Sequence, residues 1–230
     1  MAAMRILATV LATLAAALAF ECAAAPFAVQ VGDSRIAVDA PQGFSDTAFT
    51  GSPRLQELAE TLTSPSNRIL LFAITDGDLR RFMAGDPPEF KRQALIATPR
   101  STEMERTRAE AFATFAEGAM RDFGAPPAAG TDYRKLLDAQ PGKVQTLAEL
   151  RRDGSTVSVM QGMRLPSPPR PMFAEERPGH YVLSTTTFLL VRGKTLALQM
   201  VASYEAPGDL DWLRAATLRW VDDLQKLNSR

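Results

Sequence analysis

The chain has 230 residues, of which 46% are hydrophobic and 23% are charged, as in an ordinary globular protein. Its 26 basic and 26 acidic residues balance each other. Proteins that bind nucleic acids usually carry a basic excess, so we expect no nucleic-acid partner. Cys22 is the single cysteine, which excludes an internal disulfide.

The first predicted element is a signal peptide over residues 1–24. Arg5 supplies one positive charge, residues 6–20 are all apolar or small, and Cys22-Ala23-Ala24 offers a small-x-small cleavage site. This order is typical of a secretory signal peptide. We expect cleavage after the last of these alanines and export of residues 25–230, so that the mature protein is periplasmic or secreted.

Two alternatives for this segment stay open. An uncleaved membrane anchor needs about 20 apolar residues, but the apolar run stops at Glu21. A lipoprotein would be lipidated on Cys22, but such cysteines usually follow small residues, and Phe20 and Glu21 precede this one. We therefore expect no stable membrane insertion after the signal is removed.

Turn and cap residues define the first elements of the mature chain. Two short strands are predicted around a Gly32-Asp33 turn. A helix is predicted over residues 52–63, because Ser52 is a good cap and Pro53 suits the first helical position.

Apolar runs predict two strands next, over residues 68–75 and 92–98, and the first of them is continuous enough to be covered on both faces. Asp76-Gly77 is interpreted as a turn, followed by a short helix. A longer amphipathic helix is predicted over residues 102–123, where Thr102 and Glu105 have the spacing of a capping box.

The second half of the chain changes to a period of two, which is typical of strands. Residues 144–165 form a predicted hairpin with a two-residue turn at Asp153-Gly154. A second hairpin is predicted over residues 180–205, with its turn at Arg192-Gly193-Lys194. An amphipathic helix over residues 208–227 ends the chain.

These elements predict the α+β class: a mainly antiparallel sheet built from hairpins and covered by amphipathic helices. The loops at residues 124–130 and 165–179 are too short to separate independent cores. We therefore expect a single α+β domain over residues 25–230 after the signal peptide.

Both ends of the mature chain resemble the PsbP-like α/β/α sandwich group. The resemblance is carried by "IAVDAPQGF" near the start, and by "VRGKTLALQMVASYE" and "DLDWLRAATLRWVDDL" near the end. It implies a sandwich of helices on a sheet and a binding or accessory role, without common catalytic residues. Fold analogy of this kind says little about function.

One catalytic constellation has to be considered. Gly32-Asp33-Ser34 is similar to a hydrolase signature, and a Ser–His relay would have to use His180, the sole histidine. The sequence after Ser34 reads as a strand instead of the helix found in that family, so a hairpin turn explains these residues. We expect no catalytic residues and keep a hydrolase of unrecognised type, using His180 and a serine, as the alternative.

No metal or cofactor is expected. One histidine and one cysteine cannot supply the three ligands of a zinc site. The nearest carboxylate pairs are Asp76-Gly77-Asp78, which matches a turn, and Asp209 with Asp211, which match the negative charge favoured at a helix N-terminus. No phosphate-loop or dinucleotide glycine pattern is present.

Two features exceed what the fold requires. The proline-rich segment over residues 166–179 joins two hairpins and carries Arg170, Met172 and Phe173, and long ordered loops are enriched in function. Trp212 falls opposite the apolar stripe of the last helix. We predict that these four residues, with His180 at the end of the loop, contact a partner.

The sequence therefore predicts an exported, non-catalytic binding or accessory module of the cell envelope, with an unknown protein or small-molecule partner. Besides the hydrolase, the other alternative is a structural envelope component anchored through an uncleaved or lipidated N-terminus.

Overall fold

A seven-stranded antiparallel sheet forms the middle layer of the protein. The computed structural model describes residues 26–166 and 180–229. There the strand order is β3-β4-β5-β9-β8-β7-β6, and β1 and β2 form a separate hairpin. The strands are β1 (Phe27–Val31), β2 (Ser34–Val38), β3 (Phe44–Asp46), β4 (Asn67–Thr75), β5 (Arg92–Pro99), β6 (Gln145–Arg152), β7 (Thr156–Arg164), β8 (Tyr181–Val191) and β9 (Lys194–Ser203).

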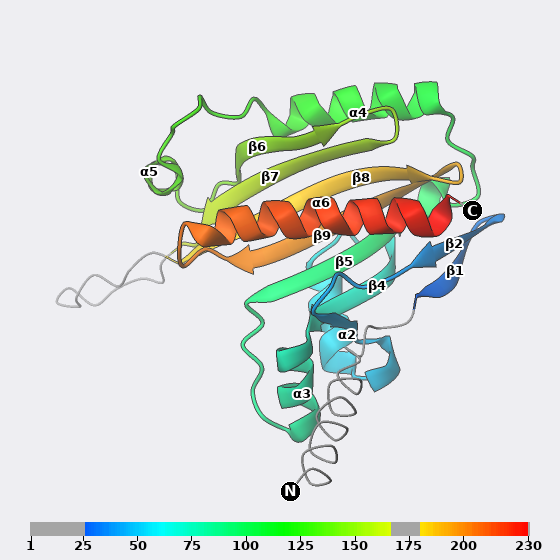
Figure 1. Cartoon of the computed structure of the whole chain (residues 1–230), viewed down its shortest axis with the longest axis horizontal. Helices are drawn as coiled ribbons and strands as arrows, with labels where there is room; N and C mark the ends of the chain where they lie inside the picture. The colour runs from blue at the N-terminus through cyan, green and yellow to red at the C-terminus, as the bar shows by residue number, and fades with distance from the viewer. Residues whose placement is uncertain (1–25, 167–179, 230) are drawn as a thin grey trace, which may run out of the picture.

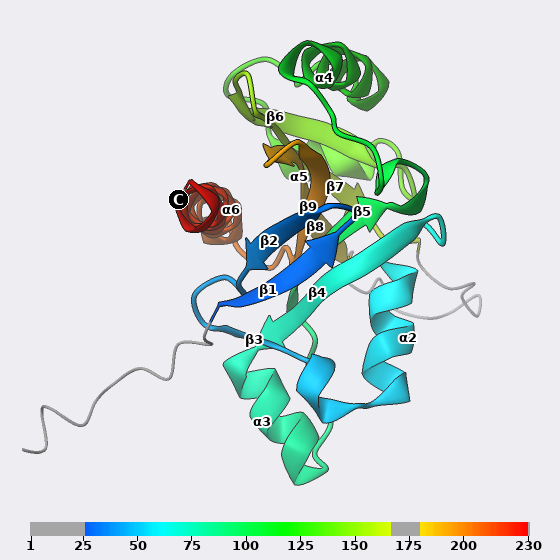
Figure 2. The same cartoon turned by 90° about the vertical axis from the view of Figure 1, so that its right-hand side faces the viewer.

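Helices cover both faces of this sheet. The α-helices are α2 (Pro53–Thr61), α3 (Asp76–Ala84), α4 (Ala109–Phe123), α5 (Tyr133–Asp138) and α6 (Gly208–Asn228), and the 3₁₀ turns are η1 (Ala48–Thr50) and η2 (Arg100–Thr102). In Figures 1 and 2, α6 lies along one face, with the β1–β2 hairpin beside it.

The cross-strand register places the other helices on the opposite face. Val157, Phe188, Ala197 and Ala97 are successive cross-strand partners, so their side chains share one face of the sheet. Val157 and Phe188 pack with α4, and Ala97 packs with α2 and α3. The fold is therefore of the predicted α+β class, with a sheet between two helical layers.

A buried hydroxyl pair joins α6 to the sheet, and a second pair lies between two strands beneath it. The Thr217 hydroxyl of α6 lies 2.8 Å from the Thr185 hydroxyl of β8, and Ser158 of β7 lies 2.6 Å from Thr187 of β8. Around them pack the apolar side chains of the predicted stripe, Leu213, Trp220, Val221 and Leu224. Each hydroxyl satisfies the other, so burial carries no unpaired polar group.

Most predicted elements are confirmed. Both hairpins, the Gly32-Asp33 turn and the final helix are present. α2 begins where predicted, because the Ser52 side chain accepts a hydrogen bond from the Leu55 N–H. β4 is buried on both faces over residues 70–74, as its apolar run predicts.

Three local predictions are wrong. Asp76 and Gly77 are the first residues of α3, because the Thr75 hydroxyl caps that helix by accepting from the Asp78 N–H. The turn between β6 and β7 has three residues, since the Asp153 carboxylate accepts from the Ser155 N–H and closes an Asx turn. The long helix starts at Ala109 and not at Thr102.

The late start of α4 has a specific cause in Lys194. The side chain of Lys194 is only 1% exposed, and its Nζ donates to the carbonyl oxygens of Glu103 at 2.9 Å and Glu105 at 2.7 Å. Its ammonium also lies 3.0 Å from the Asp33 carboxylate. These contacts hold residues 103–105 as a loop, because carbonyls bonded to Lys194 are directed away from a helical ladder.

Gly32 makes room for this arrangement. Its φ is +55°, a conformation that favours glycine. A Cβ at this position would collide with the Glu103 carbonyl oxygen and lie 2.8 Å from the Lys194 Nζ. The predicted turn glycine is thus also required by a close approach of the backbone.

We expect Lys194→Met to lower the free energy of unfolding by about 2–3 kcal/mol, because two partly buried carbonyls lose their donor. Urea titration of the purified protein measures this. Lys226→Met is the matched control, since the Lys226 side chain is 78% exposed, and we expect it to change stability by less than about 0.5 kcal/mol. Equal effects of the two changes would contradict the role of Lys194.

A second prediction concerns Asp33. The hydrogen bonds from Arg106 and then Lys194 hold the pKa of the Asp33 carboxyl well below its ordinary value of 3.8. A carboxyl with a lowered folded pKa stabilises the fold above its ordinary pKa, and this contribution is lost as the pH falls below that value. We therefore expect wild type to be more stable than Asp33→Asn near pH 7, with a difference that shrinks towards pH 2. A difference independent of pH in urea titrations would contradict this.

Candidate functional site

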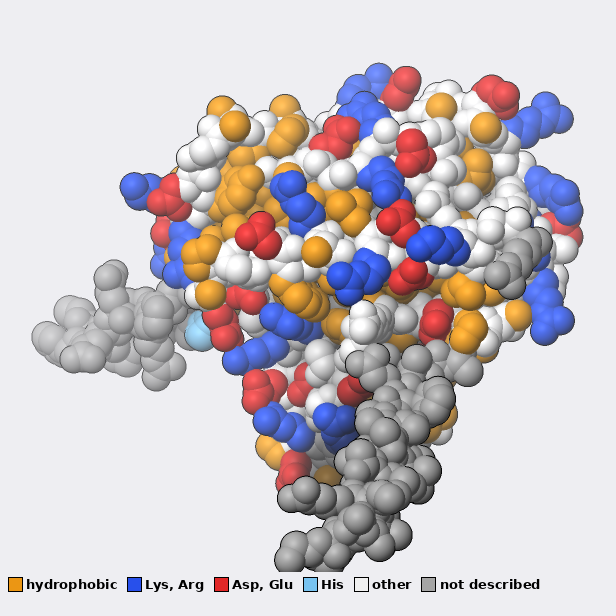
Figure 3. All heavy atoms as spheres, viewed as in Figure 1, with side chains coloured by type: hydrophobic (Ala, Val, Ile, Leu, Met, Phe, Trp, Pro, Cys, Tyr) orange, Lys and Arg blue, Asp and Glu red, His pale blue; other side chains and the backbone are white. Residues whose placement is uncertain are grey.

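Of the five residues predicted to bind a partner, the structure describes His180 and Trp212. Arg170, Met172 and Phe173 lie outside the described residues, so their role stays a prediction. His180 directly precedes β8 and is exposed, and Figure 3 shows the histidine ring in pale blue at the surface.

The structure separates His180 from Ser34. The Ser34 hydroxyl lies 3.4 Å from the carbonyl oxygen of Arg192, in the turn that follows β8. His180 precedes the same strand, which has 11 residues and so spans roughly 36 Å. A relay between these two residues is therefore excluded, and the Gly-Asp-Ser segment is the hairpin turn described above.

Trp212 is not an outward-facing side chain. It is half-buried, its ring stacks with Phe44 at a centroid distance of 6.4 Å, and the Arg92 guanidinium lies 3.8 Å from its ring centroid. Arg92 also pairs with Asp209 at 3.3 Å. The expected exposure is wrong because β5 supplies an arginine that covers this side of α6.

At least one carboxylate of each predicted pair has a structural partner. Asp78 accepts from the Glu89 N–H at 2.8 Å, and Asp209 accepts from the Glu205 and Ala206 N–H groups. Among the described residues, no three His, Cys, Asp or Glu side chains are grouped so that they could hold a metal ion. These carboxylates therefore cap helices and loops.

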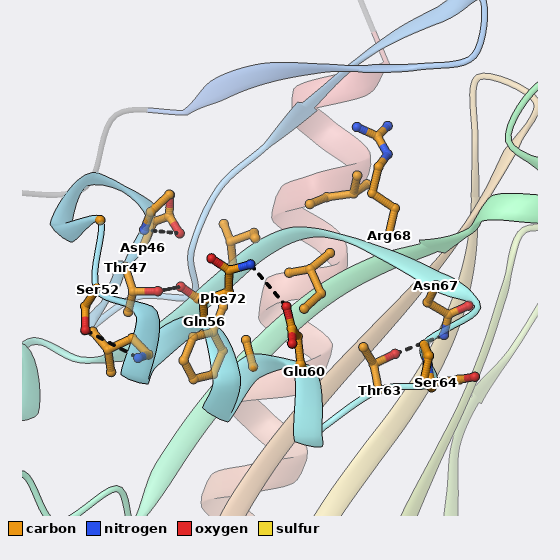
Figure 4. A pocket seen from close by; sticks show the side chains of 18 of the residues that line it. Asp46, Thr47, Ser52, Gln56, Glu60, Thr63, Ser64, Asn67, Arg68 and Phe72 are labelled. Carbon is orange, nitrogen blue, oxygen red and sulfur yellow. Dashed lines mark hydrogen bonds between the residues drawn. The ribbon is translucent and has the colours of Figure 1, made fainter.

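The candidate site is instead a groove between α2 and β4, which we call the α2–β4 groove. Its volume is about 610 Å³. Leu55, Gln56, Ala59 and Glu60 of α2 line one wall, and residues 67–72 of β4 line the other. Figure 4 shows these side chains around the space between the helix and the strand.

Hydrogen bonds within the walls hold the groove in shape. Gln56 donates to Glu60 at 3.1 Å along α2, and Asn67 donates to the Thr63 hydroxyl at 2.9 Å. The Thr47 backbone N–H and hydroxyl both donate to the Phe72 carbonyl, at 2.8 and 3.0 Å. The two walls are thus fixed by short local contacts at both ends.

The strand wall of the groove is an open edge of the sheet. β3 pairs only with residues 73–75 of β4. In the part of the chain that the structure describes, no strand pairs with that side of residues 67–71. An open strand edge presents unpaired backbone N–H and C=O groups. The groove therefore offers such groups between its two ends, where the Asn67 N–H bonds the Ser64 carbonyl and the Phe72 carbonyl accepts from Thr47.

The two ends of the groove differ in charge. Asp46 lies at the end where β3 meets Ala73, and burial raises the pKa of its carboxyl above the ordinary value. Arg100 lies at the other end, where its N–H bonds the Ser66 carbonyl. The neighbouring Arg68 is already paired with Glu103 at 2.7 Å, so Arg100 is the cation available there.

The groove has no signature in the sequence. Its residues carry no catalytic motif, and each element was predicted from local signals alone. One signal was present: Ser52-Pro53 starts a helix a few residues after Asp46, which leaves room for only a short β3. A short edge strand beside a nine-residue β4 is what uncovers the groove.

Comparison with known proteins finds similarity at the level of structure. No family model matches the chain, and no curated protein sequence matches it. The chain is similar to the crystal structure of the Ran-binding protein Mog1p of Saccharomyces cerevisiae, with 11% sequence identity and a TM-score of 0.35 over 90% of this chain and 93% of that one. At this level the similarity identifies neither a family nor a partner.

Across the described ranges, none of the helices combines the length and the apolar character that crossing a bilayer requires. Figure 3 shows Lys, Arg, Asp and Glu side chains interspersed over the face that α6 covers.

Proposed function

We propose that this protein is an exported, non-catalytic binding module of the cell envelope, and that it holds a protein partner in the α2–β4 groove. The observation that carries the proposal is the groove of about 610 Å³ along an uncovered strand edge. Ligand sites are usually concave, mostly preformed and lined by apolar groups with a few polar ones. The α2–β4 groove is concave, and polar residues such as Gln56, Glu60 and Asn67 line it alongside the apolar Leu55, Ile69 and Leu71.

The proposal includes the resemblance to the PsbP-like group. The arrangement of a sheet between two helical layers supports that resemblance, and it agrees with a binding or accessory role. A hydrolase that uses His180 and Ser34 is not proposed, since the two residues lie at opposite ends of β8.

Export is tested at the N-terminus. We expect sequencing of the protein recovered from the periplasm or medium to begin between Ala23 and Phe27, because small residues at a cleavage site are what signal peptidase requires. A protein that starts at Met1 in the membrane fraction would support the anchored structural component instead. A lipidated Cys22 would replace the soluble module with a lipoprotein.

The groove is tested by a photo-crosslinking amino acid placed at Gln56 in cells that export the chain. We expect a partner that crosslinks from Gln56 and not from Arg214, an exposed residue of α6. With that purified partner, Gln56→Trp should weaken binding by at least about tenfold, since the indole fills the groove.

Glu57→Trp is the matched control, because Glu57 is an exposed neighbour on α2 that does not line the groove. We expect this variant to bind as wild type does, and both variants to keep the wild-type melting temperature. Equal crosslinking from Gln56 and Arg214, or equal binding by the two tryptophan variants, would refute the groove as the binding surface.

A further inference from the structure

We infer that the α2–β4 groove takes its partner as an extended peptide segment, which adds to β4 as an extra strand and places an acidic side chain at the Arg100 end. This inference rests on the proposed function and names the class of partner. Strand addition obtains affinity from backbone hydrogen bonds and specificity from the pockets that receive alternate side chains.

The two edges of the sheet differ in how their strands are paired. β6, the edge strand at the far end, contains two register shifts in its pairing with β7, whereas the open part of β4 contains one, between Ile69 and Leu71. Each such bulge disturbs further pairing at an edge. At the other edge, β3 stops at Asp46, where Thr47 makes the last bond to the Phe72 carbonyl. The segment of β4 beyond that bond is left for another strand.

The length of the open edge suits a short segment. Residues 67–71 span roughly 17 Å as a strand. The pairing of β4 with β5 shifts between Ile69 and Leu71, so an added strand has to follow a bulge in the middle. We therefore expect pairing over about four residues and not a long ladder.

Apolar surface is available for one set of side chains. Alternate side chains of an added strand point to opposite faces, and one set would face α2. The apolar lining of the groove includes the exposed Ala48 and Pro65 and the buried Leu55 and Ala59 of α2. Phe49 of η1 is 68% exposed, and its neighbour Ala48 also lines the groove. These residues favour small or medium apolar side chains on that face of the peptide.

Charge sets the direction of the peptide. Arg100 is exposed, and its guanidinium makes no hydrogen bond or ion pair with residues 26–166 or 180–229 that would neutralise it. Asp46 lies at the opposite end and disfavours an anion there. An acidic residue in the peptide therefore gains at the Arg100 end and loses at the other.

The test starts from a phage library of random dodecapeptides panned on the exported protein. We expect enriched sequences with alternating apolar residues and an Asp or Glu near one end. On addition of the best synthetic peptide, amide hydrogen exchange should slow by at least about tenfold within residues 68–71, because their free edge becomes hydrogen bonded.

Two changes separate strand addition from other modes of binding. Methylation of alternate backbone nitrogens on the side of the peptide that faces β4 should weaken binding by at least about tenfold, whereas methylation of the other set should have little effect. Arg100→Glu should weaken binding of the acidic peptide by a similar factor, about tenfold, and Arg214→Glu is the control that should not.

The outcomes distinguish this inference from the proposed function. No enriched peptide, no slowed exchange in β4, or equal effects of the two methylation patterns would overturn strand addition. A partner that crosslinks from Gln56 without protecting residues 68–71 would leave the binding module intact and refute the extended peptide. If no partner crosslinks from Gln56, both the proposed binding module and the strand addition would be overturned.

Discussion

The contacts of the buried Lys194 ammonium determine the position of the β1–β2 hairpin and the start of α4. It joins three segments that are far apart in sequence: the β1–β2 turn at Asp33, the carbonyls of Glu103 and Glu105, and the turn that opens β9. A buried charge is tolerated only when its partners satisfy it. Because all three partners are oxygen atoms at fixed positions, the lysine specifies where the hairpin lies and where α4 can begin.

The uncovered edge of β4 results from the short pairing between β3 and β4. β3 has three residues, and Thr47 then turns the chain into η1 and α2 by bonding the Phe72 carbonyl twice. A longer β3 would have closed the edge. Instead α2 returns alongside β4 at a distance that leaves a groove, with its walls fixed by Gln56–Glu60 and Asn67–Thr63.

The sequence predicts the individual helices and strands better than it predicts the contacts between them. Hairpin turns and caps such as Ser52 act through neighbours in the chain, so the strands and α2 could be read directly. Residues 103–105 could not, because their conformation is set by Lys194, a residue of β9. The half-burial of Trp212 could not be predicted for the same reason, since Arg92 of β5 covers its ring, and its contact with a partner stays a prediction. The groove likewise cannot be predicted from neighbours in the chain, because it exists only where β3 stops pairing with β4.

The buried hydroxyls between α6 and the sheet impose a rule on how the core can change. Thr185 and Thr217 contact each other at 2.8 Å, and the Thr217 hydroxyl also donates to the Met200 Sδ at 3.4 Å. Replacement of Thr217 by valine therefore leaves the Thr185 hydroxyl buried and unpaired, whereas replacement of Thr185 leaves Thr217 with its sulfur acceptor. The two positions are coupled, although they are 32 residues apart, and a change that begins at Thr185 is tolerated better than one that begins at Thr217.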